Sequence, residues 1–175
     1  MTDQAASRAR DTAMMARCIE LSRDATREGE YPFACIICCG DDVVVEVINR
    51  VARDGDLTRH AELMAVSQAQ KLLGKTKLKD CTLYANVEPC PMCSFAIREA
   101  GIGRVLFSLK SPFMGGLSRW NVLGDGELSR RMPEVFGKAP EIVTGLLAKE
   151  AARVWRRWNP IVWGVIRWRG IFGWR

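Results

Sequence analysis

The chain has 175 residues, of which 48% are hydrophobic and 26% charged, and its formal net charge is +6. This length and mixture predict one globular domain with an ordinary hydrophobic core. No segment is long and apolar enough to span a bilayer, and the polar residues 1–11 do not resemble a secretory signal. We therefore expect seven reduced cysteines and a cytoplasmic location.

The positive charge is concentrated at the C-terminus. Residues 151–175 carry six arginines and no acidic residue, so residues 1–150 have no net charge, and five of the six tryptophans lie at 155–174. Arginine interleaved with tryptophan suits nucleic acid, an anionic membrane surface or a protein interface. We favour packing within the subunit or against a second copy, with nucleic acid still possible. We interpret residues 1–158 as one domain, whose catalytic motif is described below, and 159–175 as an extension of that domain.

The predicted elements alternate between helices and strands. In chain order they are a helix at 7–28, strands at 33–39 and 43–48, a helix at 60–74, a strand at 82–87, a helix at 90–100, strands at 104–109 and 141–146, and a helix at 147–158. Glycines mark 115–116 and 124–140 as mobile loops. This order predicts an α/β fold, a three-layer α/β/α sandwich whose mixed five-stranded sheet has helices on both faces.

One histidine and two cysteines form the strongest motif. His60 lies in His60-Ala61-Glu62, and the two cysteines lie in Pro89-Cys90-Pro91-Met92-Cys93. One imidazole and two thiolates suit zinc and leave the fourth tetrahedral position open to water, as in catalytic sites. Zinc in such a site lowers the pKa of its water to about 7. The motif therefore predicts a catalytic zinc centre.

The local sequence around this motif predicts two helix starts. Thr58 is placed to cap the helix that begins near His60, and Pro91 suits only the first turn of a second helix. Cys90 and Cys93 then share one helical face, and the helix N-terminus favours their thiolate forms. Glu62 is two residues from His60, so it can reach the water without binding the metal. We expect it to transfer protons during hydrolysis.

Cys35 and Cys38 form a second CxxC pattern. They lie in the apolar segment Phe33-Ala34-Cys35-Ile36-Ile37-Cys38-Cys39, which is typical of a buried strand. Side chains three residues apart on a strand point to opposite faces, so these two thiols cannot hold one ion. We predict that they are small core residues.

The pattern H-x-E…P-C-x-x-C resembles the zinc nucleobase deaminases. From about Arg17 to Trp158 the chain resembles the cytidine deaminase superfamily, on the branch of guanine deaminases, yeast-type cytosine deaminases and tRNA adenosine deaminases. The resemblance implies that His60, Cys90 and Cys93 bind Zn²⁺ and that Glu62 is the proton shuttle. It also implies a homodimer.

The resemblance extends to candidate substrate contacts. Asn49 matches an asparagine that contacts the base in this branch, although an asparagine at a strand end is often only a turn residue. Phe33, in Glu30-Tyr31-Pro32-Phe33-Ala34, matches the small-base enzymes, although a strand aromatic commonly packs in the core. We also place Ala61 and Trp120 among the substrate contacts, the latter as a loop side chain able to stack on a base or close the pocket.

These features favour zinc-dependent hydrolytic deamination of a free nucleobase or nucleoside, purine rather than pyrimidine, with guanine as the first choice. One alternative is a tRNA adenosine deaminase that converts adenosine to inosine in an anticodon loop, for which only the tail supplies the phosphate-binding charge. A cytosine or cytidine deaminase is also open. Outside this class, the chain could be an inactive zinc-scaffolded domain with an anion-binding tail, but such a scaffold would not need Glu62.

Overall fold

A five-stranded mixed sheet forms the centre of the molecule, in a computed structural model that describes residues 3–173. The strands are β1 (Ala34–Cys39), β2 (Asp42–Ile48), β3 (Cys81–Val87), β4 (Arg104–Leu109) and β5 (Glu141–Thr144), in the spatial order β2-β1-β3-β4-β5. β1 pairs antiparallel with both β2 and β3, whereas β3, β4 and β5 run parallel. The parallel strands therefore end at one edge, where ligand sites of open α/β sheets lie.

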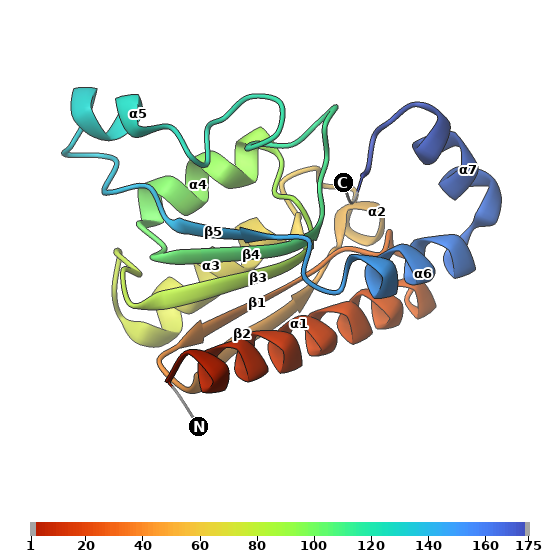
Figure 1. Cartoon of the computed structure of the whole chain (residues 1–175), viewed down its shortest axis with the longest axis horizontal. Coiled ribbons are helices and arrows are strands. Elements are labelled where there is room, and N and C mark those ends of the chain that lie inside the picture. Colours follow the sequence, from red (N-terminus) through yellow and green to blue (C-terminus); the bar gives the residue numbers. More distant parts are fainter. Residues whose placement is uncertain (1–2, 174–175) are drawn as a thin grey trace.

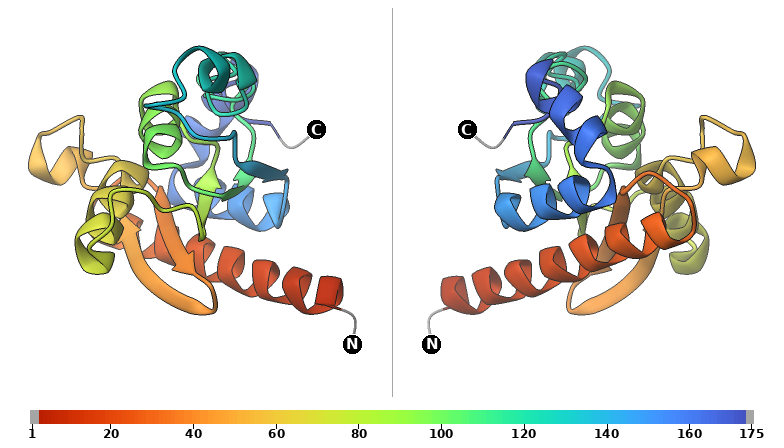
Figure 2. Two further views of the ribbon diagram at one scale, coloured as in Figure 1. Left: turned by 90° about the vertical axis from the view of Figure 1, so that its left-hand side faces the viewer. Right: turned by 90° about the vertical axis from the view of Figure 1, so that its right-hand side faces the viewer.

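Helices cover both faces of this sheet, as predicted. The helices are α1 (Asp3–Arg27), α2 (Val51–Asp54), α3 (Ala61–Leu73), α4 (Pro91–Ala100), α5 (Gly126–Arg131), α6 (Ala148–Trp158) and α7 (Pro160–Trp168). α3 and α4 pack on one face, and α1 and α6 on the other (Figures 1 and 2). The three-layer α/β/α prediction is confirmed.

Each face of the sheet has its own hydrophobic core. Successive side chains of β1 point to opposite faces of the sheet. Ile36 and Cys38 lie in the core beneath α1 and α6, and Cys35 and Ile37 lie in the core beneath α3 and α4. Cys35 and Cys38 are thus buried on opposite faces, as their spacing predicts. No helix within residues 3–173 is long and apolar enough to cross a membrane.

Two local predictions are wrong. Thr58 does not cap α3: its hydroxyl and backbone N–H both donate to Asp56, and His60 takes the N-cap position without a side-chain cap bond. The stretch 124–140, predicted as a loop, contains α5, because the Asp125 side chain accepts from Glu127 N and caps that helix. Other boundaries shift by a few residues, and α2 and α7 are additional to the predicted elements.

The C-terminal segment folds back onto the same subunit. The Asn159 side chain caps α7 by accepting from Ile161 N and Val162 N. Beyond α7, Gly173 forms two backbone hydrogen bonds with Lys110 at the end of β4, with lengths of 2.8 and 2.9 Å. Trp163, Ile166 and Phe172 are buried in the core shared with α1 and α6. Trp174 and Arg175, the last residues of the predicted Trp/Arg-rich extension, lie outside the described residues.

Candidate active site

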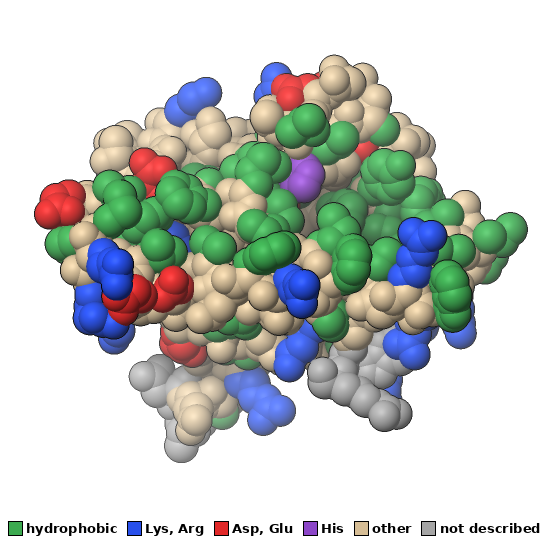
Figure 3. All heavy atoms as spheres, turned by 90° about the horizontal axis from the view of Figure 1, so that it is seen from above, with side chains coloured by type: hydrophobic (Ala, Val, Ile, Leu, Met, Phe, Trp, Pro, Cys, Tyr) green, Lys and Arg blue, Asp and Glu red, His purple; other side chains and the backbone are tan. Residues whose placement is uncertain are grey.

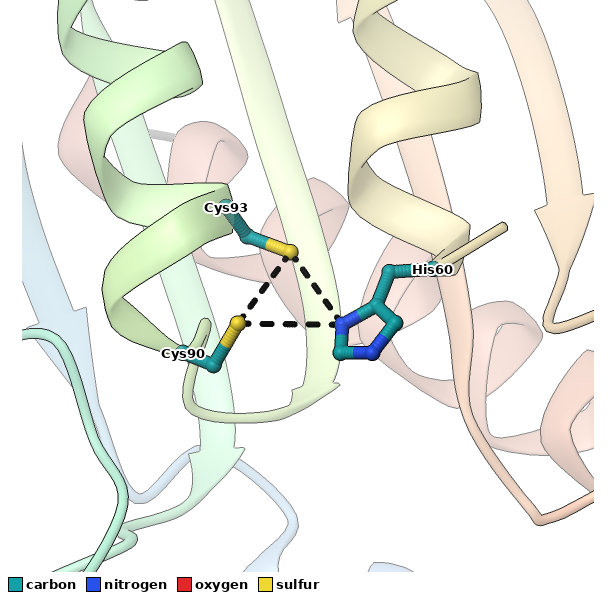
Figure 4. A group of neighbouring side chains, drawn as sticks. All are labelled: His60, Cys90 and Cys93. Carbon is teal, nitrogen blue, oxygen red and sulfur yellow. Dashed lines mark hydrogen bonds between the residues drawn. The ribbon is translucent and has the colours of Figure 1, made fainter. Parts of the chain in front are cut away.

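Two helix N-termini meet at the carboxyl end of β3. His60 is the N-cap of α3, and Cys90 is the N-cap of α4, which follows β3 after a short turn. Pro91 occupies the first turn of α4, where its missing N–H costs nothing, and Cys93 lies one turn further on. The three side chains point toward one another between the two helices (Figure 4).

The spacing of these three ligand atoms fits a tetrahedral metal. The Sγ atoms of Cys90 and Cys93 are 3.6 Å apart, and they lie 3.7 and 3.5 Å from His60 Nδ1. Zinc at about 2.3 Å from sulfur and about 2.0 Å from nitrogen would place two sulfurs about 3.8 Å apart, and sulfur about 3.5 Å from nitrogen. The side chains of His60, Cys90 and Cys93 can thus hold Zn²⁺ without rearrangement.

The electrostatics of the cluster favour a thiolate at Cys90. A hydrogen bond from Cys93, assisted by one from His60, lowers the pKa of Cys90 to about 4. The same contact between the two cysteines raises the pKa of Cys93. Zinc binds thiolate sulfur, so a thiol that is already deprotonated at neutral pH suits the metal.

Glu62 lies in the first turn of α3, beside the cluster but outside the set of three ligands. Its side chain is buried, with 7% of the residue exposed, and one carboxylate oxygen is 3.7 Å from Cys93 Sγ. Burial raises the pKa of Glu62 to about 7. A carboxyl group with such a pKa can both accept and release a proton near neutral pH.

A cavity of about 100 Å³ opens beside this cluster. It is lined by Phe33, Asn49, His60, Glu62, Val87, Glu88, Cys90, Ser111, Met114 and Phe172. Seen from above, the single histidine reaches the surface among hydrophobic side chains (Figure 3). Of the site residues anticipated from sequence, Phe33, Asn49, His60, Glu62 and Cys90 line this cavity. Cys93 belongs to the metal cluster but not to the lining, and Ala61 and Trp120 are also absent from the lining. Ala61 is fully buried, and Trp120 is 59% exposed with its ring against Arg119.

Sequence reasoning missed two buried carboxylates at the cavity, Glu88 in its lining and Glu30 behind it. Glu30 receives hydrogen bonds from the Asn49 side chain and from the backbone at the start of α2. Glu88, two residues before Cys90, accepts from the backbone N–H groups of Ser111, Leu117 and Ser118, at 2.6–2.9 Å. Each glutamate thereby fixes a loop at the cavity. Only the nearness of Glu88 to the cysteine motif could have drawn attention to it.

Phe172 was also missed. Its ring packs edge to face on Trp155, with centroids 5.0 Å apart, and it forms one wall of the cavity. It lies in the tail that Lys110 and Ser111 anchor through backbone and side-chain hydrogen bonds. The chain's own C-terminal segment therefore completes the cavity.

Residues 8–109, more than half of the chain, match the model of the cytidine and deoxycytidylate deaminase zinc-binding region. The chain belongs to this family. The match contains His60, Cys90 and Cys93 and thus agrees with the geometry of the metal site.

Individual deaminases of this family resemble the chain over most of its length. The probable cytosine deaminase of Schizosaccharomyces pombe is 39% identical over 77% of this chain and 76% of that protein. A guanine deaminase from Nitrosomonas europaea superimposes with a TM-score of 0.71 at 26% identity, covering 85% of this chain and 84% of the other. A tRNA deaminase structure, from work on A-to-I editing at the wobble position, gives 0.68 at 26% identity, covering 81% of this chain and 99% of the other.

A longer relative also contains this domain. The tRNA(Ile)-lysidine synthase of Deinococcus radiodurans is 35% identical over 89% of this chain, but the chain spans only 25% of that protein. This chain is thus similar to most of the length of a probable cytosine deaminase and to a quarter of a longer tRNA(Ile)-lysidine synthase.

Proposed function

We propose that the protein is a zinc-dependent hydrolase that deaminates a free nucleobase or nucleoside, with purines preferred and guanine as the first candidate. The observation that carries this proposal is one cavity that joins the His60 and Cys90 donors, Glu62 and two aromatic side chains, Phe33 and Phe172. Metal, proton-transfer group and apolar walls are the three components that hydrolysis of a flat aromatic amine requires.

The reaction exchanges an exocyclic amino group for oxygen. Zinc, when bound by His60, Cys90 and Cys93, would supply the Lewis acidity that makes water a nucleophile at neutral pH. Glu62 would accept one proton from the attacking water and deliver it to a ring nitrogen, and would then transfer the remaining hydroxyl proton to the departing amine. A C–O bond forms, the C–N bond breaks, and ammonia leaves. Burial of Glu62 supports this role, because it keeps the group able to exist in both protonation states.

The position of the tail supports a small substrate. Phe172 forms a cavity wall, and backbone hydrogen bonds hold its segment against Lys110. The chain can therefore present this aromatic side chain to a base without a second subunit or a bound nucleic acid. The similar guanine deaminase structure adds weight to guanine. A cytoplasmic location is proposed as well, because thiolate ligands for zinc need a reducing compartment.

Deamination of adenosine in tRNA is the second candidate. It is favoured by the similar tRNA deaminase structure and by the exposed arginines of α6, Arg153, Arg156 and Arg157. Because phosphate contacts release counterions, tRNA binding through these side chains would weaken steeply with salt. Cytosine is a third substrate to test, given the S. pombe relative. Dimer formation, expected from the family, is proposed as well.

The test is ammonia release by the zinc-loaded protein from guanine, adenine, cytosine, their nucleosides and an anticodon stem-loop. Fastest turnover of a free purine supports the proposal. Turnover of the stem-loop alone would replace it with tRNA deamination. Silence on every substrate would favour a scaffold that holds zinc without using it.

A further inference from the structure

Glu30 lies directly behind the wall of the cavity that contains Asn49. It is 1% exposed, in the connection between α1 and β1, and it is not among the residues that line the cavity. Its carboxylate accepts from Asn49 Nδ2 at 2.7 Å, and from the backbone N–H groups of Arg53 and Ala52 at 2.5 and 3.3 Å. Three donors thus offset the cost of burying this side chain.

The contact with Glu30 determines how the Asn49 amide is turned. The two ends of an amide group have similar size and opposite hydrogen-bonding character. Because carboxylate oxygens accept hydrogen bonds, the NH₂ end of Asn49 must face Glu30. The reversed orientation would bring two acceptor oxygens together in a buried place. The backbone of Asn49 is held too, since its N–H donates to Phe33 O at 2.9 Å.

We propose that Glu30 is a positioning residue for substrate specificity, which acts by fixing the donor and acceptor pattern that Asn49 presents to the base. This inference rests on the proposed function. With one N–H bonded to Glu30, Asn49 keeps one N–H and Oδ1 for other partners, in an arrangement that cannot reverse. A base whose edge has the opposite pattern leaves buried polar groups unpaired and is rejected.

The competing explanation is that Glu30 only holds the start of α2. Glu30→Gln separates the two explanations, because glutamine keeps the length and one acceptor oxygen for the short bond from Arg53 N–H, while its NH₂ group replaces the oxygen that faces Asn49 and the long contact from Ala52 N–H. Its NH₂ group can also donate, so Asn49 could then adopt either orientation. We expect kcat/KM for the preferred purine to fall by about 10- to 100-fold, mainly through KM, with the ratio between purines moving toward one.

A double-mutant cycle makes the coupling measurable. If Glu30 acts through Asn49, Glu30→Gln has no further effect on kcat/KM in an Asn49→Ala background. Multiplicative losses would mean that Glu30 acts independently, and the proposal would be wrong. Asp11→Asn is the matched control: Asp11 is another buried carboxylate, bound to Tyr84 and Arg104 away from the cavity, so its change should leave the purine ratio unchanged.

A spectroscopic measurement decides the matter without turnover. The side-chain NH₂ protons of Asn49 can be assigned in ¹⁵N spectra of the zinc-loaded protein as the pair of signals that Asn49→Ala removes. In the wild type, the hydrogen bond to Glu30 should shift the resonance of one Asn49 NH₂ proton and protect that proton from exchange with solvent. Both effects should disappear in Glu30→Gln and remain in Asp11→Asn. An unchanged pair in Glu30→Gln would overturn the proposal. If no base is deaminated, the proposed function fails and this result still stands alone.

Discussion

The ring of Phe172 meets the ring of Phe33 edge to face, with 6.4 Å between their centroids and 88° between their planes. Phe33 lies just before β1 and Phe172 just after α7, so this contact joins the first strand to the tail. Both side chains line the cavity beside His60. The segment that carries the excess positive charge of the chain is therefore also part of the proposed substrate site.

Replacing Phe172 should weaken substrate binding selectively. Phe172→Leu keeps an apolar side chain but removes the flat face on which a base can stack, an interaction worth about 1–3 kcal/mol. We expect KM for the preferred base to rise roughly 5- to 100-fold with the zinc content unchanged. Trp168→Leu is the control, because Trp168 is in the same tail and 83% exposed. Equal effects of the two substitutions would show that Phe172 is not a substrate contact.

The metal site gives a second prediction, on stoichiometry. Cys90→Ala should remove zinc, whereas Cys38→Ala should retain one zinc per chain, because Cys38 is buried in the core on the opposite face of the sheet. Metal analysis after gel filtration measures both. Loss of zinc from the Cys38 variant would contradict the assignment of the site.

Zinc should also stabilise the fold. An ion bound only by the native state adds about 4 kcal/mol when its free concentration is about 1,000 times the dissociation constant. Chelation should therefore lower the melting temperature of the wild type, and readdition of zinc should restore it. Cys90→Ala should already melt at the lower temperature and should not respond to chelator.

Packing around Gly116 predicts a contrast between two glycines. A Cβ at Gly116 would lie 2.0 Å from Ser94 Oγ and 3.0 Å from Pro89 O, whereas a Cβ at Gly126 would meet nothing within 4 Å. Gly116→Ala should cost about 1–3 kcal/mol in unfolding free energy, and Gly126→Ala should be neutral or slightly stabilising. Denaturant titration compares them. Similar stabilities would mean that the loop bearing Gly116 is not held against α4.

The fold is predictable from sequence where the signal is local. The periodic apolar residues of α3 and the proline in the first turn of α4 are sufficient to place His60 and Cys90 at two helix starts. The alternation of Cys35 and Cys38 across a strand likewise excludes a second metal site from the sequence alone. These inferences need only neighbouring residues and the geometry of one element.

The remaining features depend on contacts between distant segments. Arg98, buried in α4, donates to the carbonyls of Val122, Leu123 and Asp125, so a stretch whose glycines favour a loop is held in place and contains a helix. Glu30 and Glu88 are acidic residues whose partners are mostly backbone N–H groups, which have no side-chain signature. Phe172 reaches the cavity because the tail folds back and pairs with the residue after β4. The hydrophobic periodicity of the sequence contains no information about such a long-range contact.

The most direct test of the proposed chemistry compares the wild type with Glu62→Gln, both zinc-loaded, on the preferred purine. For guanine, the wild type should release one ammonia for each xanthine formed. Glu62→Gln should bind the same amount of zinc and turn over about 100- to 10,000-fold more slowly, because the proton carrier is lost while the ligands remain. Loss of zinc from the variant, or turnover equal to the wild type, would contradict the role of Glu62 and with it the proposed chemistry.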